Sequence, residues 1–363
     1  MSGLFCQEPN NVECIDYKQI EDKTKYNLKG SSIINIHPIC IDIFSKNFRE
    51  SYRNLSKFMK NDDFNFERTN SKNRIYTFSN TTITNIGIII TENNYYFNGG
   101  CYKEYNINKE EAKIYQKILE NNPSKKYKKV ISIAELWGEG VWHFPIEAIV
   151  GLKNITDFSD IYLHITKKNK LCLKWIELLK IPIPEERIID GDIFAETLII
   201  PEMSGCGSPK YDLTIWLKNK IYRNINLSLN NNLFILIKRN NKRIVKNHDE
   251  LEKICKTFCQ KLNLQLYIHD DINLPTLKKQ MEIFNKAKIV IGPHGAGAVN
   301  LLASKPGTHF LEFLPDAQNL INTCYIQLAN HINVNYYGIP YKVNENVDLQ
   351  LVIDKLLTIE KNM

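Results

Sequence analysis

A glycine-rich turn in the last quarter of the sequence carries the strongest signal for chemistry. Gly292-Pro293-His294-Gly295-Ala296-Gly297 follows an apolar run at 289–291 and precedes another at 298–303. Where such a turn meets a helix start, free backbone N–H groups and the positive end of the helix dipole favour a phosphate or another anion. The spacing fits neither the dinucleotide fingerprint nor the P-loop. The alternative is a tight turn whose glycines only relieve steric crowding.

Two arginines follow a different strand-like run. Arg239 and Arg243 come after residues 233–238, whose sequence LFILIK is typical of a buried strand. Two guanidiniums facing the glycine turn would hold a diphosphate through bidentate, charge-assisted hydrogen bonds. A diphosphate that departs during a reaction needs such neutralisation where no metal supplies it. A solvated basic loop is the alternative.

Three polar residues in or after the turn are candidates for the same ligand. His294 could donate to a phosphate or to the departing oxygen, or it could cap the turn. Asn300 falls in the first helical turn, where it is better placed to hold the loop than to react. Glu312 could accept from ribose hydroxyls, and a glutamate on the strand surface is its alternative. The predicted anion site is completed by Gly295, Ala296 and Gly297.

A second group of candidates, in the first half of the chain, is suited to acid–base chemistry. His143 and Glu147 are four residues apart and can share one helix face, although Pro145 leaves the start of that helix open. A carboxylate one turn away can hold an imidazole as a base. Glu139, between two glycines, is a third candidate. The alternative for His143 is a core position beside Trp142.

Neither a metal nor a cofactor is predicted. Asp190-Gly191-Asp192 has the spacing of carboxylates that hold a divalent cation, but Asp-Gly in a short loop between strands is ordinary turn chemistry. The nine cysteines are scattered without a CxxC pair. Cys255 and Cys259 are four apart on an expected helix, with no histidine pair at zinc spacing. We interpret the cysteines as reduced thiols, most of them packed in the core.

The elements that must position these residues alternate between strands and helices. In the first half we expect a hairpin or meander at 74–97, strands at 129–134, 160–165, 187–189 and 197–200, and helices at 48–59, 108–119 and 172–179. In the second half we expect strands at 233–238, 264–268, 289–291 and 309–314, and helices at 212–224, 247–262, 275–287, 298–303 and 349–361. This alternation predicts an α/β protein with mainly parallel sheets. The arginine loop and the glycine turn then both follow strand carboxyl ends, where open α/β sheets bind ligands.

Length and composition indicate a globular protein of two domains. The chain has 363 residues, of which 43% are hydrophobic and 24% charged. We expect an N-terminal domain over 1–200, in which 1–73 shows little pattern, a second domain over 201–340, and a C-terminal helix within 341–363. The best linker candidate is PEMSGCGSP at 201–209, because it is small and rich in turn residues.

Charge and hydropathy restrict the partners. The net charge of +7 comes from 47 basic and 40 acidic residues without a block of like charge, so no nucleic-acid partner is predicted. No uncharged apolar stretch is long enough to cross a bilayer. Residues 1–23 lack the apolar segment of a signal peptide. We therefore expect a cytoplasmic protein without a transmembrane segment.

Several of these motifs occur together, and in this order, in one known family. They are Trp142-His143-Phe144 with Glu147, Lys238-Arg239 with Arg243, residues 280–287, the glycine turn with Asn300-Leu301-Leu302, and Pro306-Gly307 before Leu311-Glu312-Phe313-Leu314-Pro315. On these residues the chain resembles glycosyltransferase family 61, over roughly 74–338. The family includes plant β-1,2-xylosyltransferases and animal O-linked and O-mannose-linked N-acetylglucosaminyltransferases. Two departures are Ala298-Val299 in place of the usual Leu-Thr, and Pro145 after the histidine.

The resemblance implies a GT-B fold, with two Rossmann-like domains facing across a cleft, and an inverting, metal-independent mechanism. The donor would be a nucleotide diphosphate sugar, usually uridine-linked and of N-acetylglucosamine or xylose type, with Arg239, Arg243 and the turn from His294 to Gly297 on its diphosphate. A hydroxyl of a glycan or protein-linked acceptor would attack, with His143 or Glu147 as general base. A member without a membrane anchor is similar to microbial or viral ones, which for a virus would mean the host cytoplasm or the virion.

Two other functions fit parts of the sequence. A hydrolase could use the glycine turn as an oxyanion hole, but it would need a nucleophile elbow, and no GxSxG is present. A non-catalytic module that binds a nucleotide sugar or a glycan would use the same turn and arginines. Release of nucleotide diphosphate in the presence of donor and acceptor separates the enzyme from the module.

Overall fold

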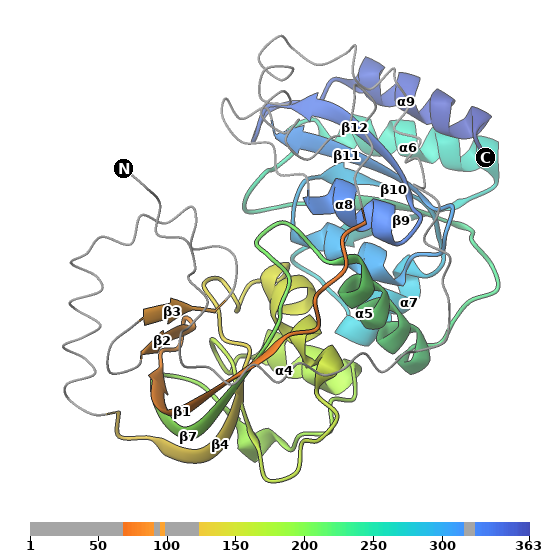
Figure 1. Ribbon diagram of the computed structural model, residues 1–363. Coiled ribbons are helices and arrows are strands. Elements are labelled where there is room, and N and C mark those ends of the chain that lie inside the picture. Colours follow the sequence, from red (N-terminus) through yellow and green to blue (C-terminus); the bar gives the residue numbers. More distant parts are fainter. Residues whose placement is uncertain (1–67, 91–94, 99–122, 316–323) are drawn as a thin grey trace. The chain divides into compact units, whose positions relative to one another are not determined.

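The structure, a computed structural model, describes residues 68–90, 95–98, 123–315 and 324–363. The described chain separates into two compact units, one over 69–217 and the other over 218–363 together with Arg68. Figure 1 shows that each unit contains a β-sheet with helices packed against it. The predicted domain limits at 200 and 340 stay predictions. The helices predicted at 48–59 and 108–119 lie outside the described residues.

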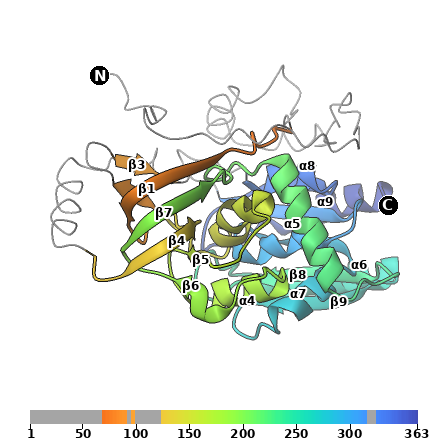
Figure 2. The ribbon, with the colours of Figure 1, turned by 60° about the horizontal axis from the view of Figure 1, so that its bottom comes forward.

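The first unit is built on a seven-stranded mixed sheet with the order β3-β2-β1-β7-β4-β5-β6. Its strands are β1 (Ile75–Ile83), β2 (Ile88–Ile90), β3 (Tyr95–Phe97), β4 (Lys126–Ser132), β5 (Tyr162–His164), β6 (Ile188–Ile189) and β7 (Ile193–Pro201). Strands β7, β4, β5 and β6 are parallel, whereas β1, β2 and β3 form an antiparallel meander joined to β7 (Figure 2). The meander predicted at 74–97 is therefore confirmed. Only part of this sheet is parallel, because that meander pairs with it instead of crossing over.

Strand β7 is longer than the predicted strand at 197–200. It pairs with β1 along its whole length, from Ile193 opposite Ile83 to Pro201 opposite Ile75. Its first residues show weak local periodicity, so their pairing depends on the partner strand. Strand β4 changes from exposed to fully buried along its length, which directs its last residues into the core and its following loop to the carboxyl edge of the sheet.

The helical segments of the first unit are short. They are η3 (Phe144–Ala148), η4 (Ile149–Asn154), α4 (Lys170–Leu178) and η5 (Glu185–Arg187), and α5 (Tyr211–Asn224) then leads into the second unit. The segment η3 is a π-helical turn whose five residues are all buried. Pro145 lies in its first turn, where its missing N–H costs no helical hydrogen bond. The start of this helical segment, which the sequence left open, lies at Phe144, and the coil is wider than an α-helix.

The second unit is a five-stranded parallel sheet with the order β12-β11-β10-β8-β9. The strands are β8 (Leu233–Lys238), β9 (Gln265–Asp270), β10 (Ala287–Pro293), β11 (His309–Pro315) and β12 (Asn335–Tyr341). The connecting segments are α6 (His248–Leu262), α7 (Leu277–Phe284), η6 (Ala296–Ala303) and α8 (Cys324–His331), and α9 (Leu349–Lys361) ends the chain. The predicted alternation is confirmed in this unit. The segment expected as a helix at 298–303 is a 3-10 helix that begins two residues earlier.

Both faces of the second sheet are covered. Alternate residues of β8, β10 and β11, such as Phe234, Ile289 and Leu311, share one core with α6 and α9, which lie side by side (Figure 1). On the other face, Phe310 packs against Tyr325 of α8 in an edge-to-face contact. Helices on both faces of a parallel sheet are the hallmark of a doubly wound, Rossmann-like unit. The GT-B arrangement expected from the resemblance goes beyond this and stays a prediction.

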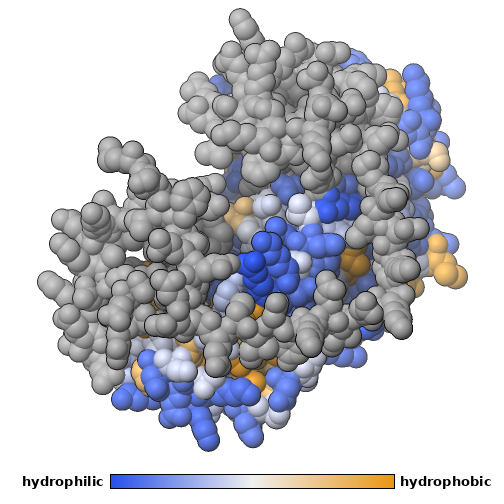
Figure 3. Space-filling view, viewed as in Figure 1, coloured by the Kyte–Doolittle hydropathy of each residue, from blue (hydrophilic) through white to orange (hydrophobic). Residues whose placement is uncertain are grey.

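The apolar residues are mostly inside these two cores. On the face drawn in Figure 3, the visible described residues are largely hydrophilic, with some hydrophobic residues among them. Among the described residues, no helix combines the length and the apolar character needed to cross a membrane.

Candidate functional site

The glycine turn of the second unit connects β10 to η6. Arg239 and Arg243, the two arginines predicted from the sequence, both lie beside it. Gly295 has a φ of 151°, a backbone conformation that L-residues rarely adopt. A Cβ built on Gly295 would lie 2.0 Å from Nη1 of Arg239 and 3.2 Å from Nη1 of Arg243. The backbone conformation therefore favours glycine here, and a side chain at this position would displace the two guanidiniums. The arginine loop reaches the turn because β8 and β10 are neighbours in the sheet.

The two guanidiniums are held differently. Nε of Arg239 lies 3.2 Å from Oδ2 of Asp271, and the side chain is 14% exposed. Nη1 of Arg239 is buried and has no hydrogen-bond partner among the described residues. Nη1 of Arg243 donates to the carbonyl oxygen of His294 at 3.2 Å. A buried, charged donor without an acceptor is costly, so this corner favours an anionic ligand.

The orientation of His294 is set by contacts with Glu312 and Tyr325, and Tyr336 in turn holds Glu312. Its Nδ1 lies 2.5 Å from Oε1 of Glu312, and Tyr336 donates to Oε2 of the same carboxylate at 2.6 Å. The hydroxyl of Tyr325 donates to the carbonyl of Gly295 at 2.6 Å, and its ring meets the imidazole edge to face. Burial raises the pKa of Tyr325 well above its usual value, so this hydroxyl stays a donor.

Glu312 is not placed as the sequence predicted. Its side chain is fully buried and both oxygens already accept hydrogen bonds within the unit. It cannot also accept from ribose hydroxyls, so we assign it to positioning His294. Spacing alone could not show this, because the strand β11 that carries Glu312 is buried on both faces.

Asn300 holds the helical segment after the turn, as expected. Its amide nitrogen lies 3.2 Å from Oε1 of Gln280 and 3.3 Å from Nε2 of His269. Burial lowers the pKa of His269 to about 4, so its imidazole is neutral and can accept this bond. His269 was not singled out in the sequence. The sequence feature that could have indicated His269 is its position as a polar residue directly after the predicted strand at 264–268.

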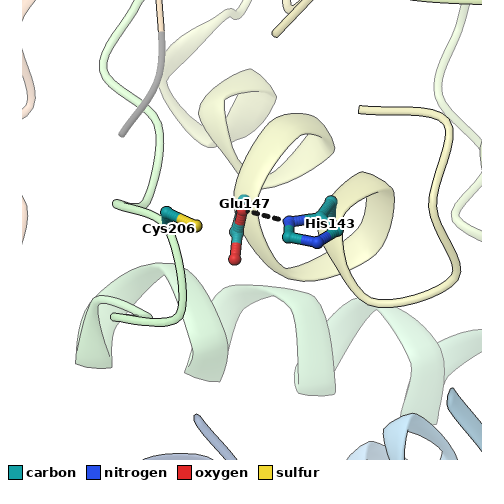
Figure 4. A group of neighbouring side chains, drawn as sticks. All are labelled: His143, Glu147 and Cys206. Atoms are coloured by element: carbon teal, nitrogen blue, oxygen red, sulfur yellow. Dashed lines mark hydrogen bonds and ion pairs between the residues drawn. The ribbon is translucent and has the colours of Figure 1, made fainter. Parts of the chain in front are cut away.

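In the first unit, His143 and Glu147 form a hydrogen-bonded dyad (Figure 4). Nδ1 of His143 lies 2.7 Å from Oε2 of Glu147. Oε1 of Glu147 accepts from the indole nitrogen of Trp142 at 2.7 Å and from the backbone N–H of Gly207 at 2.8 Å. The glutamate side chain is fully buried, whereas that of His143 is 28% exposed. The histidine is therefore the member that a substrate can reach.

The same cluster does not fit a metal ion. The potential ligand atoms of His143, Glu147 and Cys206 lie within 4.8 Å of one another. Cys206 is disulfide-bonded, however, and has no thiolate to offer. One oxygen of Glu147 is also occupied by two N–H donors. This donor set is unsuited to a metal.

The disulfide corrects the expectation that the cysteines are reduced thiols. Its partner lies outside the described residues. Among those residues Cys172, Cys255 and Cys259 are free thiols, and these three and Cys324 are buried as expected. Disulfides are typical of oxidising compartments. The cytoplasmic location expected from the sequence stays a prediction.

A buried glutamate near the dyad was missed in the sequence. Glu135 is 1% exposed, and neither of its carboxyl oxygens has a hydrogen-bond partner in the described part of the chain. Burial, and then the charge of Glu147, raise its pKa well above its usual value. Glu135 is therefore a candidate for a neutral carboxylic acid. A glutamate just after the predicted strand at 129–134 gave no reason to expect burial.

The remaining acidic candidates lie in other contacts. Glu139 is 46% exposed and pairs with Lys167 at 3.3 Å, and no described contact joins it to the dyad. Asp190 accepts from the backbone N–H of Lys168, and Asp192 from that of Asn85. Both donors are distant in the sequence, so these are not the local turn bonds expected for Asp190-Gly191-Asp192.

The fold and these sites define the class of protein. It is an α/β protein with two sheets, consistent with two Rossmann-like domains, and with two guanidiniums gathered at a glycine turn at the carboxyl edge of the parallel sheet in the second unit. More particularly, residues 141–311 match the family Glycosyltransferase 61. This segment is therefore similar to a glycosyltransferase family 61 domain, a family whose name implies glycosyltransferase activity.

The other comparisons add little. Comparison with curated protein sequences gave no match. Among solved structures, a mutant flavo di-iron protein from Thermotoga maritima is similar at 10% identity over 85% of this chain and 70% of that chain. The TM-score of 0.28 is too low for this likeness to carry an argument.

Proposed function

We propose that the protein is an inverting, metal-independent glycosyltransferase. It would move a sugar of N-acetylglucosamine or xylose type from a nucleotide diphosphate sugar, uridine-linked, to a hydroxyl of a glycan or protein-linked acceptor. The observation that carries this proposal is the pair of guanidiniums at Gly295, one of which has a buried donor without an acceptor. Such a corner suits the diphosphate of the donor, because charge-assisted bonds to phosphate are strong and bidentate.

In the donor site, the proposed role of the protein is to neutralise the negative charge of the diphosphate. When the bond between the anomeric carbon and the diphosphate breaks, its electron pair goes to the diphosphate oxygen. Arg239 and Arg243 would stabilise that added charge, which removes the need for a divalent cation. His294, whose Nδ1 bonds to Oε1 of Glu312, would present its other ring nitrogen to the phosphate.

At the acceptor end, we assign the general base to His143 and a positioning role to Glu147. The buried carboxylate accepts three hydrogen bonds, from His143, Trp142 and Gly207, so it holds the imidazole in one orientation. The acceptor hydroxyl would give its proton to the imidazole as its oxygen bonds to the anomeric carbon. Glu147 would stabilise the imidazolium that forms. A single displacement of this kind inverts the anomeric configuration.

The test is release of UDP from UDP-N-acetylglucosamine and UDP-xylose, with and without a panel of glycan and glycopeptide acceptors. We expect release to depend on an acceptor, to persist in EDTA, and to give a product of inverted configuration by NMR. Saturable UDP binding without turnover on any acceptor would favour the alternative, a non-catalytic nucleotide-sugar or glycan-binding module. Loss of activity in EDTA that Mn²⁺ restores would refute metal independence and return attention to Asp190 and Asp192.

A further inference from the structure

A pocket of about 440 Å³ lies at the carboxyl edge of the first sheet, apart from the contacts of the dyad. Its walls come from the loops after three neighbouring parallel strands: Trp137 after β4, Lys167 after β5 and Asp190 after β6. The turn between β1 and β2, at Asn85, closes one side. This is the edge at which open α/β sheets bind ligands.

Trp137 is the unusual residue of this pocket. The residue is 49% exposed, and its φ is 69°, in the left-handed region that bulky residues avoid. Strained backbone of this kind persists only where the surroundings impose it, and it gathers at functional sites. An exposed indole offers a flat apolar face beside a polar nitrogen.

The loop that presents Trp137 is rigidly supported. Its backbone N–H groups at Gly138 and Gly140 donate to the carbonyls of Glu135 and Trp137 at 3.0 and 2.8 Å. Oγ1 of Thr166 bonds to both the N–H and the carbonyl of Glu135, and a Cβ on Gly138 would lie 2.3 Å from that oxygen. The pocket wall is therefore preformed, which is usual for small-molecule sites.

The charged groups that line the pocket are two carboxylates and one ammonium, beside the neutral polar residues Asn85 and Thr166. Glu139 pairs with Lys167 at the rim, and Asp190 uses Oδ2 for a backbone N–H. Carboxylates accept from hydroxyl groups and repel phosphates, so an anionic nucleotide is disfavoured here. A neutral ring with an apolar face and several hydroxyls fits both the indole and the carboxylates.

We propose that this pocket binds a pyranose ring of the acceptor, stacked on Trp137 with its hydroxyls toward Asp190 and the Glu139–Lys167 pair. Naming the ring as the acceptor's rests on the proposed transferase function. Trp137 and His143 belong to one loop. Two backbone hydrogen bonds hold this loop together, from the N–H of Gly140 to the carbonyl of Trp137 and from the N–H of Phe144 to the carbonyl of Gly140. A sugar held on the indole would thus be bound by the segment that carries the proposed base.

The experiment is ¹⁹F NMR on the full chain labelled with 5-fluorotryptophan, which replaces its four tryptophans. The probes are the methyl β-glycosides of xylose, N-acetylglucosamine and galactose, and methyl α-mannoside. We expect at least one of them to shift the Trp137 resonance saturably, while the resonance of the fully buried Trp175 stays in place. If none of the four moves the Trp137 resonance, the proposal is overturned.

Three variants complete the test. Trp137→Gly relieves the strained φ and should fold at least as stably, yet weaken glycoside binding by about tenfold or more, because the stacking face is gone. Trp137→Phe keeps a ring and should bind within a few-fold of the native chain. Val141→Ala, at an exposed apolar residue of the same loop that does not line the pocket, is the matched control. Glycoside affinity that is equal in Trp137→Gly and Val141→Ala overturns the stacking role.

UDP binding, measured separately by calorimetry, distinguishes this inference from the proposed function. Acceptor-dependent UDP release without a response at Trp137 would remove the pocket and leave the transferase. A glycoside response at Trp137 in a chain that binds no UDP would keep a sugar subsite and remove the transferase, and with it the description of that sugar as an acceptor.

Discussion

Replacing Gly295 with alanine should abolish most donor binding while the chain still folds. The new Cβ would be placed 2.0 Å from Nη1 of Arg239 and 3.2 Å from Nη1 of Arg243. Both atoms are the ends of flexible side chains, so the guanidiniums would move instead of the backbone. Their displacement removes from the corner the groups that we expect to bind the diphosphate.

The size of the effect follows from the bonds that would be lost. A hydrogen bond to a charged group contributes about 1.5–3 kcal/mol, so losing one such bond weakens UDP binding by roughly 10- to 150-fold. Displacement of both arginines puts the expected loss at the upper end of that range. The strained φ of 151° adds a separate cost of about 1–3 kcal/mol to the folding free energy.

Gly307 provides the matched control. It also has a positive φ, of 80°, but a Cβ there would meet no atom within 4 Å. Gly307→Ala should therefore show a loss of stability of about 1–3 kcal/mol from the same kind of strain and leave UDP affinity unchanged. Isothermal titration calorimetry with UDP, together with urea unfolding, measures both quantities. If Gly295→Ala bound UDP as tightly as Gly307→Ala, the proposed placement of the diphosphate would be refuted.

Three further predictions concern other residues of the two sites. His143→Ala should leave UDP affinity unchanged and lower kcat by about 10²- to 10⁴-fold. Glu147→Gln should also lower kcat, since the imidazolium that forms in the reaction loses its carboxylate. A loss of UDP affinity without a change in kcat would contradict the assignment. The pKa of Glu135 is raised in the folded chain, so the free energy of unfolding of the native protein should fall as the pH rises from about 4.5 through the folded pKa. The fall is at most ~1.4 kcal/mol per pH unit. Glu135→Gln has no carboxyl to titrate and should not show this fall. Urea unfolding from pH 4 to pH 8 should therefore show a flatter profile for the variant, and parallel profiles would count against a neutral, buried carboxyl. Glu312→Gln should weaken UDP binding by about tenfold because His294 loses the carboxylate that orients its imidazole, with Glu345→Gln, at an exposed pair, as an unaffected control in the same calorimetric titration.

Local pattern predicted the second unit closely. Strand β8 covers the residues of the predicted run at 233–238, and α9 those of the predicted helix at 349–361. The physical reason is that buried parallel strands are almost continuously apolar, and amphipathic helices repeat every three to four residues. In the first unit, β7 and the π-turn η3 departed from the predicted elements, because strand pairing and buried packing shape them more than their own periodicity does.

Residue types and their spacing by themselves determined the alternating α/β organisation, the glycine turn with its two arginines, and the His143–Glu147 pair. Only the tertiary structure decided which member of that pair is exposed, that Glu312 supports His294 instead of meeting a ribose, and that Glu135 is buried without a hydrogen-bond partner among the described residues. Burial and the choice of hydrogen-bond partner depend on residues far apart in the chain. Tyr336 reaches Glu312 from a neighbouring strand and Gly207 reaches Glu147 across 60 residues, and neither contact leaves a trace in local spacing.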